Sequence, residues 1–227
     1  MNIVITGCSK GIGAELVKIW TKEHIVYGLS RDADRLERLK LELDCPSNFN
    51  YLSSDVITLN SDKIKSWIKA EKIDILVNNA GFLINRPFLD ITYQDYKSVM
   101  DTNFWGAFRI TQLLAKKLST AAGQVINISS MGGVNFSSKF SGLSLYSSSK
   151  GALTILTECL AEELKPYKIR VNTLALGAVQ TEMLEEAFPE YKADMSSAQM
   201  AMYIIRFANS VDNILNGQII RATSSNP

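Results

Sequence analysis

The stretch "ITGCSKGIG", residues 5–13, determines how we interpret the rest of the chain. It follows a short β-branched run, "NIVIT", and leads into residues 11–23, whose apolar side chains recur with helical spacing. Gly7, Gly11 and Gly13 therefore lie between a predicted strand and a predicted helix. Backbone N–H groups at a helix N-terminus bind phosphate, and glycines allow a ligand to approach them. The stretch predicts a phosphate-binding turn, with a tight turn that holds no ligand as the alternative.

Beyond this turn, short apolar runs alternate with longer amphipathic stretches along the chain. The predicted strands are residues 2–6, 25–30, 48–54, 73–81, 124–130, 168–176 and 217–222. The predicted helices are residues 11–23, 32–43, 61–71, about 93–119 and about 146–164. Near-continuous apolar strands that alternate with helices indicate a parallel sheet covered on both faces.

We therefore expect a single α/β domain over residues 1–227, with a doubly wound, seven-stranded parallel sheet between two layers of helices. In such a fold, ligands bind at the carboxyl ends of the strands. Residues 182–200 carry only weak helical signals and are expected to form a cap over that edge of the sheet.

The composition argues against several other classes of protein. The chain has 24 basic and 23 acidic residues, so its net charge is +1. It therefore lacks the excess of basic residues that would favour binding to nucleic acid. The apolar runs are too short to span a membrane, and "MNIVITG" lacks the pattern of a secretion signal, so we expect a cytoplasmic protein. Three dispersed cysteines and the lone His24 have no metal-ligand spacing, so we expect reduced thiols and no metal site.

Further motifs follow the glycine turn in a characteristic order. "NNAG" at 78–81 ends the fourth predicted strand, "NISS" at 127–130 ends the fifth, and "YSSSK" at 146–150 begins a helix. Asn103 lies within "DTNFWGAF". With T-G-x-x-x-G-x-G, these motifs resemble those of the short-chain dehydrogenase/reductase family over nearly the whole chain. The resemblance implies a Rossmann-type fold and a nicotinamide-dependent oxidoreductase that interconverts a carbonyl group and a secondary alcohol.

Tyr146 and Lys150 are four residues apart, so on a helix they share one face. A free tyrosine titrates near pH 10, and a nearby ammonium group favours the phenolate and lowers that pKa. Tyr146 is therefore expected to act as the general acid and base that exchanges a proton with the substrate oxygen. The resemblance implies that Lys150 also binds the nicotinamide ribose. The alternative is a tyrosine packed in the core and a lysine that reaches solvent.

Two further residues are expected to complete the catalytic group. Ser130 is predicted to hydrogen-bond the substrate carbonyl and stabilise the developing alkoxide, with Ser129 as the competing choice. Asn103 is expected to hold the water that returns a proton to Tyr146, or else to be a helix-interior asparagine bonded to backbone. Residues 131–145 would form a large loop beside the substrate.

The expected cofactor contacts lie mainly at the ends of the predicted strands. They are Gly7, Ser9, Lys10, Gly11, Ile12, Gly13, Arg31, Asp55, Val56, Asn79, Ala80, Gly81, Tyr146, Lys150, Val179 and Thr181. By resemblance, Asp55 would bind the adenine amino group, and Asn79 and Ala80 would line the adenosine ribose. Val179 and Thr181 would bind the nicotinamide carboxamide.

The end of the second predicted strand bears on the choice of cofactor. An enzyme of this fold that uses NAD(H) usually has an acidic residue there, which binds the ribose hydroxyls. This chain has Ser30 and Arg31 instead, and Asp32 is expected to cap the following helix. Arg31 can bind a phosphate through two parallel hydrogen bonds, and Lys10 can reach the same phosphate as a point charge. The sequence therefore predicts a preference for NADP(H), with NAD(H) as a possible cofactor.

Two other functional classes share this fold. One is a dinucleotide-sensing binding protein without catalysis, and the other is an epimerase or dehydratase, whose members are generally longer. The substrate stays open among 3-oxoacyl thioesters, sugars, steroids and small carbonyl compounds, and Arg86 is either an anion contact or a solvated loop residue. Apolar side chains along residues 93–119 and 146–165 predict a homodimer or homotetramer. They are Phe104, Phe108, Leu113, Leu114, Leu153, Leu156 and Leu160.

Overall fold

The computed structural model describes residues 1–210 and 214–223. The strands are β1 (Asn2–Thr6), β2 (Ile25–Ser30), β3 (Phe49–Ser53), β4 (Ile75–Asn78), β5 (Gln124–Ser130), β6 (Arg170–Leu176) and β7 (Ile219–Ala222). The helices are α1 (Gly11–Trp20), α2 (Ala33–Leu41), α3 (Ser61–Trp67), α4 (Tyr93–Met100), α5 (Gly106–Ala121), α6 (Ser144–Glu163), α7 (Glu182–Ala187) and α8 (Ser197–Ala208).

The strands form one seven-stranded sheet in the order β3-β2-β1-β4-β5-β6-β7, and every neighbouring pair is parallel. The predicted fold class is thus confirmed. Because β1 pairs with β2 on one side and with β4 on the other, the strand order reverses at β1. A crevice opens at the carboxyl ends of the strands where the order reverses, and a dinucleotide binds there in folds of this type.

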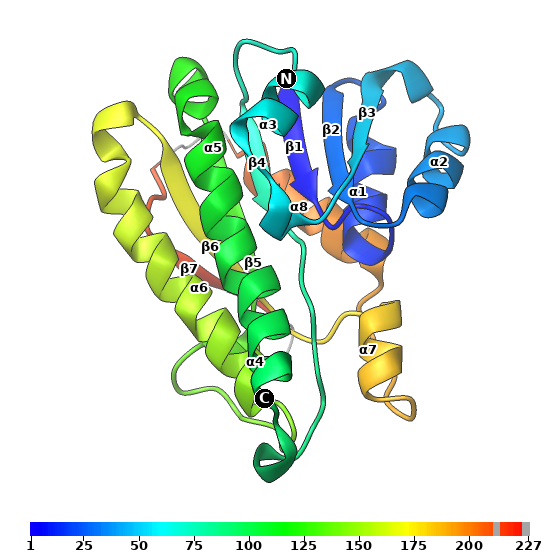
Figure 1. The fold of residues 1–227 in the computed structure, drawn as a ribbon, viewed down its shortest axis with the longest axis vertical. Helices are drawn as coiled ribbons and strands as arrows, with labels where there is room; N and C mark the ends of the chain where they lie inside the picture. The colour runs from blue at the N-terminus through cyan, green and yellow to red at the C-terminus, as the bar shows by residue number, and fades with distance from the viewer. Residues whose placement is uncertain (211–213, 224–227) are drawn as a thin grey trace.

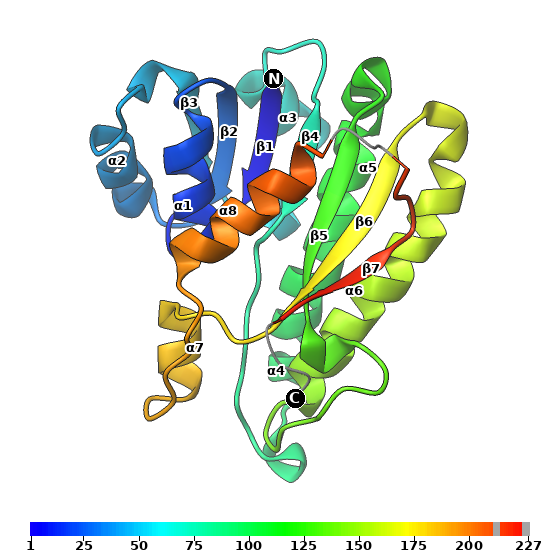
Figure 2. The ribbon, with the colours of Figure 1, turned by 180° about the vertical axis from the view of Figure 1, so that it is seen from behind.

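Helices cover both faces of the sheet. In Figure 1, α5 and α6 lie in front of the strands, and in Figure 2, α1 and α8 lie across the opposite face. Successive residues of β1 enter different clusters, because Ile3 and Ile5 pack with the α1 side while Val4 packs with the α5 side. This alternation explains why β1, which is buried on both faces, is apolar at each of its three central positions.

The predicted helix over 93–119 is interrupted. A π-helical turn, Asp101–Trp105, separates α4 from α5, and α5 continues to Ala121. Such turns insert one extra residue into a helix and are frequent at functional sites. Here the turn contains Asn103, which is 1% exposed and faces the loop after β4. The helix expected from 146 begins two residues earlier, at Ser144.

The segment expected to cap the sheet edge has two parts. Residues 182–187 form α7, a short helix that begins after Thr181, whose hydroxyl accepts a hydrogen bond from the Leu184 amide. From Ser197 the chain enters α8, and Met200 is buried against α1 and the sheet. Within the expected cap, α7 stands apart from the sheet, as Figure 2 shows.

Candidate active site

The glycine loop between β1 and α1 adopts a conformation that depends on its glycines. Gly7 has φ +66° and Gly11 has φ +55°, which other residues rarely adopt. A Cβ at Gly7 would come within 2.7 Å of the Ala80 Cα atom, and one at Gly13 would overlap the Gly7 carbonyl oxygen. The loop is thus packed closely against the chain after β4. The loop leads directly into the N-terminus of α1.

That N-terminus is available to an anion. Lys10 is the N-cap residue of α1, and its side chain has no oxygen that could accept a hydrogen bond from the first-turn N–H groups. Ser9 lies beside it, and its hydroxyl is 2.7 Å from the hydroxyl of Ser30 at the end of β2. Exposed N–H groups and the positive end of a helix dipole suit a pyrophosphate. The residues present therefore fit the phosphate groups of a dinucleotide.

The "NNAG" segment is attached to the glycine loop by four hydrogen bonds. The Thr6 hydroxyl accepts from the amides of Asn79 and Ala80 at 3.1 and 3.0 Å. The Asn79 side-chain amide donates to the carbonyl oxygens of Thr6 and Gly7 at 3.1 and 2.9 Å. Asn79 thereby joins the chain after β4 to the end of β1. This explains why the two motifs, 72 residues apart in sequence, form one wall.

Tyr146 and Lys150 lie on the same face of α6, as their spacing predicts. The Lys150 ammonium nitrogen lies 5.8 Å from the centre of the Tyr146 ring and donates to the Ile128 carbonyl at 2.8 Å. Lys150 is only 3% exposed, and burial lowers its pKa to about 8. A lysine has three N–H donors, so two remain for a ligand such as a ribose.

The acidity of Tyr146 differs from our expectation. Burial of the hydroxyl raises the pKa of Tyr146 to about 12, although a hydrogen bond with the Ser130 side chain acts in the opposite direction. The Lys150 ammonium group donates to the Ile128 carbonyl, and burial destabilises its own charge. With its pKa raised in this way, the Tyr146 hydroxyl keeps its proton at neutral pH, and a positive charge close to its oxygen would favour the phenolate.

The two serines at the end of β5 face different groups. The Ser129 hydroxyl donates to the Lys150 carbonyl at 3.0 Å, and Ser129 is 3% exposed. Ser130 is half-buried, accepts a hydrogen bond from the Gly132 amide at 3.2 Å and shares one with Tyr146. Because only Ser130 contacts the tyrosine hydroxyl, the geometry favours Ser130 over Ser129 for a contact with substrate.

The Asn103 side chain is engaged by protein groups. Its Oδ1 accepts from the Phe82 amide at 2.7 Å, and its Nδ2 donates to the Phe82 carbonyl at 2.9 Å and to the Ser149 hydroxyl at 2.8 Å. Ser149 in turn donates to the Tyr146 carbonyl at 2.7 Å. Asn103 therefore links the loop after β4 to the first turn of α6. A Cβ at Gly81 would meet both Lys150 Nζ, at 3.6 Å, and Asn103 Oδ1, at 3.7 Å, so these polar groups border one small space.

A cavity of about 660 Å³ contains most of the predicted site. Of the expected residues it is lined by Gly7, Ser9, Lys10, Gly11, Ile12, Arg31, Asp55, Val56, Asn79, Ala80, Gly81, Ser130, Tyr146, Lys150, Val179 and Thr181. Gly13 and Asn103 support this lining from behind. The structure thus brings the predicted phosphate turn and the predicted catalytic residues into a single space.

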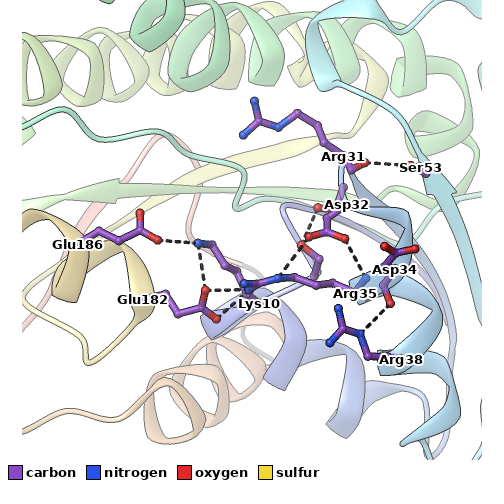
Figure 3. A network of polar contacts seen from close by, with 11 residues as sticks. Lys10, Arg31, Asp32, Asp34, Arg35, Arg38, Ser53, Glu182 and Glu186 are labelled. Carbon is purple, nitrogen blue, oxygen red and sulfur yellow. Dashed lines mark hydrogen bonds and ion pairs between the residues drawn. The ribbon is translucent and has the colours of Figure 1, made fainter.

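The charged residues at the adenosine end are arranged differently from our expectation (Figure 3). We expected Lys10 and Arg31 to converge on one phosphate. Lys10 instead pairs with Glu182 at 3.3 Å, and Arg31 lies 3.9 Å from Asp55. As expected, Asp32 caps α2 by accepting from the Arg35 amide at 2.9 Å.

Sequence reasoning missed two residues at this end of the cavity. Arg35 donates from one nitrogen to both carboxylate oxygens of Glu182, at 2.9 and 2.8 Å. Arg35 lies in the first turn of α2, four residues after Arg31, and a second arginine this close to the end of β2 was a usable signal. Glu182 had no such signal, because it lies 147 residues from Arg35.

Two other results concern metal binding and membrane spans. Within residues 1–210 and 214–223, no group of three or more His, Cys, Asp or Glu side chains is placed to hold a metal ion. In the same part of the chain, no helix is long and apolar enough to cross a membrane.

Comparison with known proteins agrees with this geometry. A family model described as short chain dehydrogenase matches residues 1–192. The chain is 34% identical to the short-chain dehydrogenase cctT of Talaromyces islandicus, over 79% of this chain and 63% of that protein. It is 32% identical to carbonyl reductase [NADPH] 2 of Sus scrofa, over 81% of this chain and 73% of that protein. The solved structure of ElxO with NADP bound superimposes with a TM-score of 0.85 and 27% identity, covering 97% of this chain and 96% of that one.

Proposed function

We propose that this chain, which belongs to the short-chain dehydrogenase/reductase family, transfers hydride between NADP(H) and a carbonyl or secondary alcohol group. The observation that carries this proposal is the placement of Tyr146, Ser130 and Lys150 in the cavity that also contains the glycine loop. The family is one of oxidoreductases that act on such groups. The individual roles of the residues and the preference between cofactors are part of the proposal.

Tyr146 is the proposed general acid and base. When a reduced nicotinamide is bound, it supplies the hydride, and the substrate oxygen then needs a proton. The Tyr146 hydroxyl is protonated at neutral pH, since its pKa lies at about 12, and it contacts Ser130. Both hydroxyls can then hydrogen-bond the same substrate oxygen, with Ser130 stabilising the alkoxide as it forms.

Lys150 and Asn103 are proposed to position the reacting groups. Lys150 is held by the Ile128 carbonyl, which leaves N–H donors for the nicotinamide ribose. Asn103 orients the start of α6 through Ser149, one hydrogen bond from the Tyr146 carbonyl. The water relay that we expected at Asn103 stays a prediction. Both Nδ2 donors of Asn103 are engaged, whereas Oδ1 accepts one hydrogen bond and keeps a second lone pair for a water.

The proposed preference for NADP(H) rests on positive charge at the end of β2. Lys10, Arg31 and Arg35 line the adenosine end. Asp32 lines it too, and its carboxylate caps α2 by accepting from the Arg35 amide. The similarity to carbonyl reductase [NADPH] 2 and to ElxO, which was solved with NADP, supports the same preference. NAD(H) is the alternative cofactor.

The substrate end of the cavity favours a neutral, largely apolar carbonyl compound. Besides the polar groups near Tyr146, the cavity is lined by the apolar or aromatic side chains of Leu83, Met131, Phe140, Leu143, Met183 and Phe188. Arg86, the candidate for an anionic substrate, is paired with Asp95. An anionic substrate would therefore have to compete with Asp95 for Arg86.

A second copy of the chain is the proposed partner, as a homodimer or homotetramer. Several of the apolar side chains that predicted this, such as Leu114 and Leu153, are buried within the chain itself. The surface of the two helices nevertheless keeps Trp105 at 44% and Ile155 at 59% exposure. Light scattering at micromolar concentration tests this proposal, and a stable monomer would contradict it.

The proposed reaction is tested by a panel of carbonyl compounds, with loss of reduced-cofactor absorbance as the measurement. We expect turnover with apolar ketones or aldehydes and NADPH. A protein that binds NADPH but reduces no member of a broad panel, and oxidises no corresponding alcohol, would instead be a dinucleotide-binding protein without catalysis.

A further inference from the structure

A carboxylate occupies the cationic subsite at the adenosine end of the cavity. Glu182, the first residue of α7, accepts two hydrogen bonds from Arg35 and lies 3.3 Å from Lys10 Nζ. Figure 3 shows its carboxylate beside these two side chains. The three residues come from separate elements, because Lys10 precedes α1, Arg35 lies in α2 and Glu182 begins the cap. This contact joins the cap to both walls of the adenosine end.

Lys10 and Arg35 line the same end of the cavity as Arg31, and a phosphate bound there would use these cations. A phosphate monoester carries about −1.5 to −2 charge at neutral pH and has three acceptor oxygens, whereas a carboxylate carries one charge and two oxygens. Both groups accept parallel hydrogen bonds from a guanidinium. A ribose phosphate and the Glu182 carboxylate cannot both pair with Arg35 and Lys10 without bringing like charges together.

We propose that Glu182 is a specificity-determining residue that competes with the 2′-phosphate of NADP(H) for Lys10 and Arg35, so that phosphate binding releases α7 from these two residues. The inference rests on the proposed function, since it takes the cofactor to bind in this cavity. A cofactor without the 2′-phosphate leaves the contact between Glu182 and Arg35 in place.

Release of α7 from Lys10 and Arg35 would also change the substrate end of the cavity. Met183 follows Glu182 directly and lines the cavity near Gly81, whose added Cβ would come within 3.8 Å of the Met183 methyl carbon. Gly81 borders Lys150. A movement of the first turn of α7 therefore changes the cavity wall next to the catalytic lysine. The adjacent Arg35 lowers the pKa of Glu182, which keeps the competitor ionised at neutral pH.

Preorganisation is the alternative role of Glu182, and it would change the affinity for phosphate in the opposite direction. By holding Lys10 and Arg35 in place, it would preorganise them for the phosphate, and its removal would weaken phosphate binding. The exposed fractions favour competition, because the side chains of Lys10 and Arg35 are each 38% exposed and can remain in reach of a ligand without Glu182.

The test uses two ligands that differ only in the phosphate, 2′-phospho-ADP-ribose and ADP-ribose, neither of which carries nicotinamide. Calorimetry at low salt gives their dissociation constants for the unmodified protein, for Glu182→Gln and for Glu185→Gln. The last variant is a matched control, because it removes the same charge from the same helix at a carboxylate that faces Gln180. We expect Glu182→Gln to bind the phosphorylated ligand about tenfold more tightly. Binding of ADP-ribose, and both ligands with Glu185→Gln, should change less than about twofold.

A second measurement needs no variant. Hydrogen exchange of the amides of residues 182–188 should become faster when 2′-phospho-ADP-ribose binds and should not become faster with ADP-ribose. Unchanged or weaker binding of the phosphorylated ligand by Glu182→Gln, or identical exchange with the two ligands, would overturn the inference while leaving the cofactor preference intact. Equal affinity of the unmodified protein for the two ligands would instead overturn the proposed preference for NADP(H).

Discussion

At the catalytic end of the cavity Lys150 is 3% exposed and donates to a backbone carbonyl, whereas at the adenosine end the side chain of Lys10 is 38% exposed and faces two glutamates. The first arrangement is held by buried hydrogen bonds between elements that also form the core. The second is held by ion pairs on the surface, which water and salt weaken. The difference teaches that the proposed reacting groups are positioned by buried contacts of the fold, while the groups proposed to select the cofactor are held by exposed ion pairs.

The largest effect is expected at the buried end. Tyr146→Phe should lower turnover by about 10²–10⁴-fold, because only the proton donor is lost. The dissociation constant for NADPH, measured by fluorescence or calorimetry, should stay nearly unchanged. Tyr167→Phe, at an exposed tyrosine, is the control. Retention of most activity by Tyr146→Phe would show that the buried end does not contain the acid.

The exposed end should control cofactor selection without controlling chemistry. Lys10→Ala combined with Arg31→Ala should raise the KM for NADPH by tens to hundreds-fold, since each charge-assisted hydrogen bond contributes roughly 1.5–3 kcal/mol. The KM for NADH should remain almost the same. Lys22→Ala, at an exposed lysine that pairs with Asp44, serves as the control. Equal kcat/KM of the unmodified protein with NADPH and NADH would contradict the proposed role of the exposed end in cofactor selection.

A pH titration of stability separates the two ends further. Burial lowers the pKa of Lys150 from 10.5 to about 8, so between these values the unfolded chain binds a proton that the folded chain has released. Lys150 therefore makes the free energy of unfolding rise with pH across this window. Tyr146, whose pKa is raised from 10.0 to about 12, acts oppositely between pH 10 and 12, where the folded chain keeps a proton that the unfolded chain loses.

We expect urea unfolding of the cofactor-free protein to show this as a difference between variants. From pH 7 to 10 the unmodified protein should gain on the order of 1–3 kcal/mol relative to Lys150→Met. Lys116→Met, at an exposed lysine, should follow the unmodified protein. Parallel curves for Lys150→Met and the unmodified protein would mean that the lysine is not destabilised by burial.

The smallest effect is expected from salt. Raising ionic strength from 0.01 M to 0.15 M shortens the Debye length from about 30 Å to about 8 Å, which screens exposed charges more than buried ones. The ratio of kcat/KM for NADPH over NADH should fall several-fold, while kcat at saturating cofactor should change little. A kcat that falls as steeply as the ratio would show that the two ends are not distinct in their exposure to solvent.

Much of this molecule follows from short-range patterns in the sequence. The alternation of apolar runs and amphipathic stretches determined the order of strands and helices, because periods of two and 3.6 residues are local properties. The glycine turn, "NNAG" and "YSSSK" determined which loops form the site, because the ends of parallel strands meet at one edge of a sheet. The spacing of Tyr146 and Lys150 also sufficed to place them on one helical face.

Only the tertiary structure decided how the side chains in that site pair. It directed Ser130, and not Ser129, toward Tyr146, engaged Asn103 with Phe82, and raised the pKa of Tyr146 where the sequence had predicted the reverse. It also placed Glu182 against Arg35 across 147 residues of chain. The physical reason is the same in each case. Side-chain direction and burial depend on contacts between distant segments, and no local period or motif encodes the distance between them.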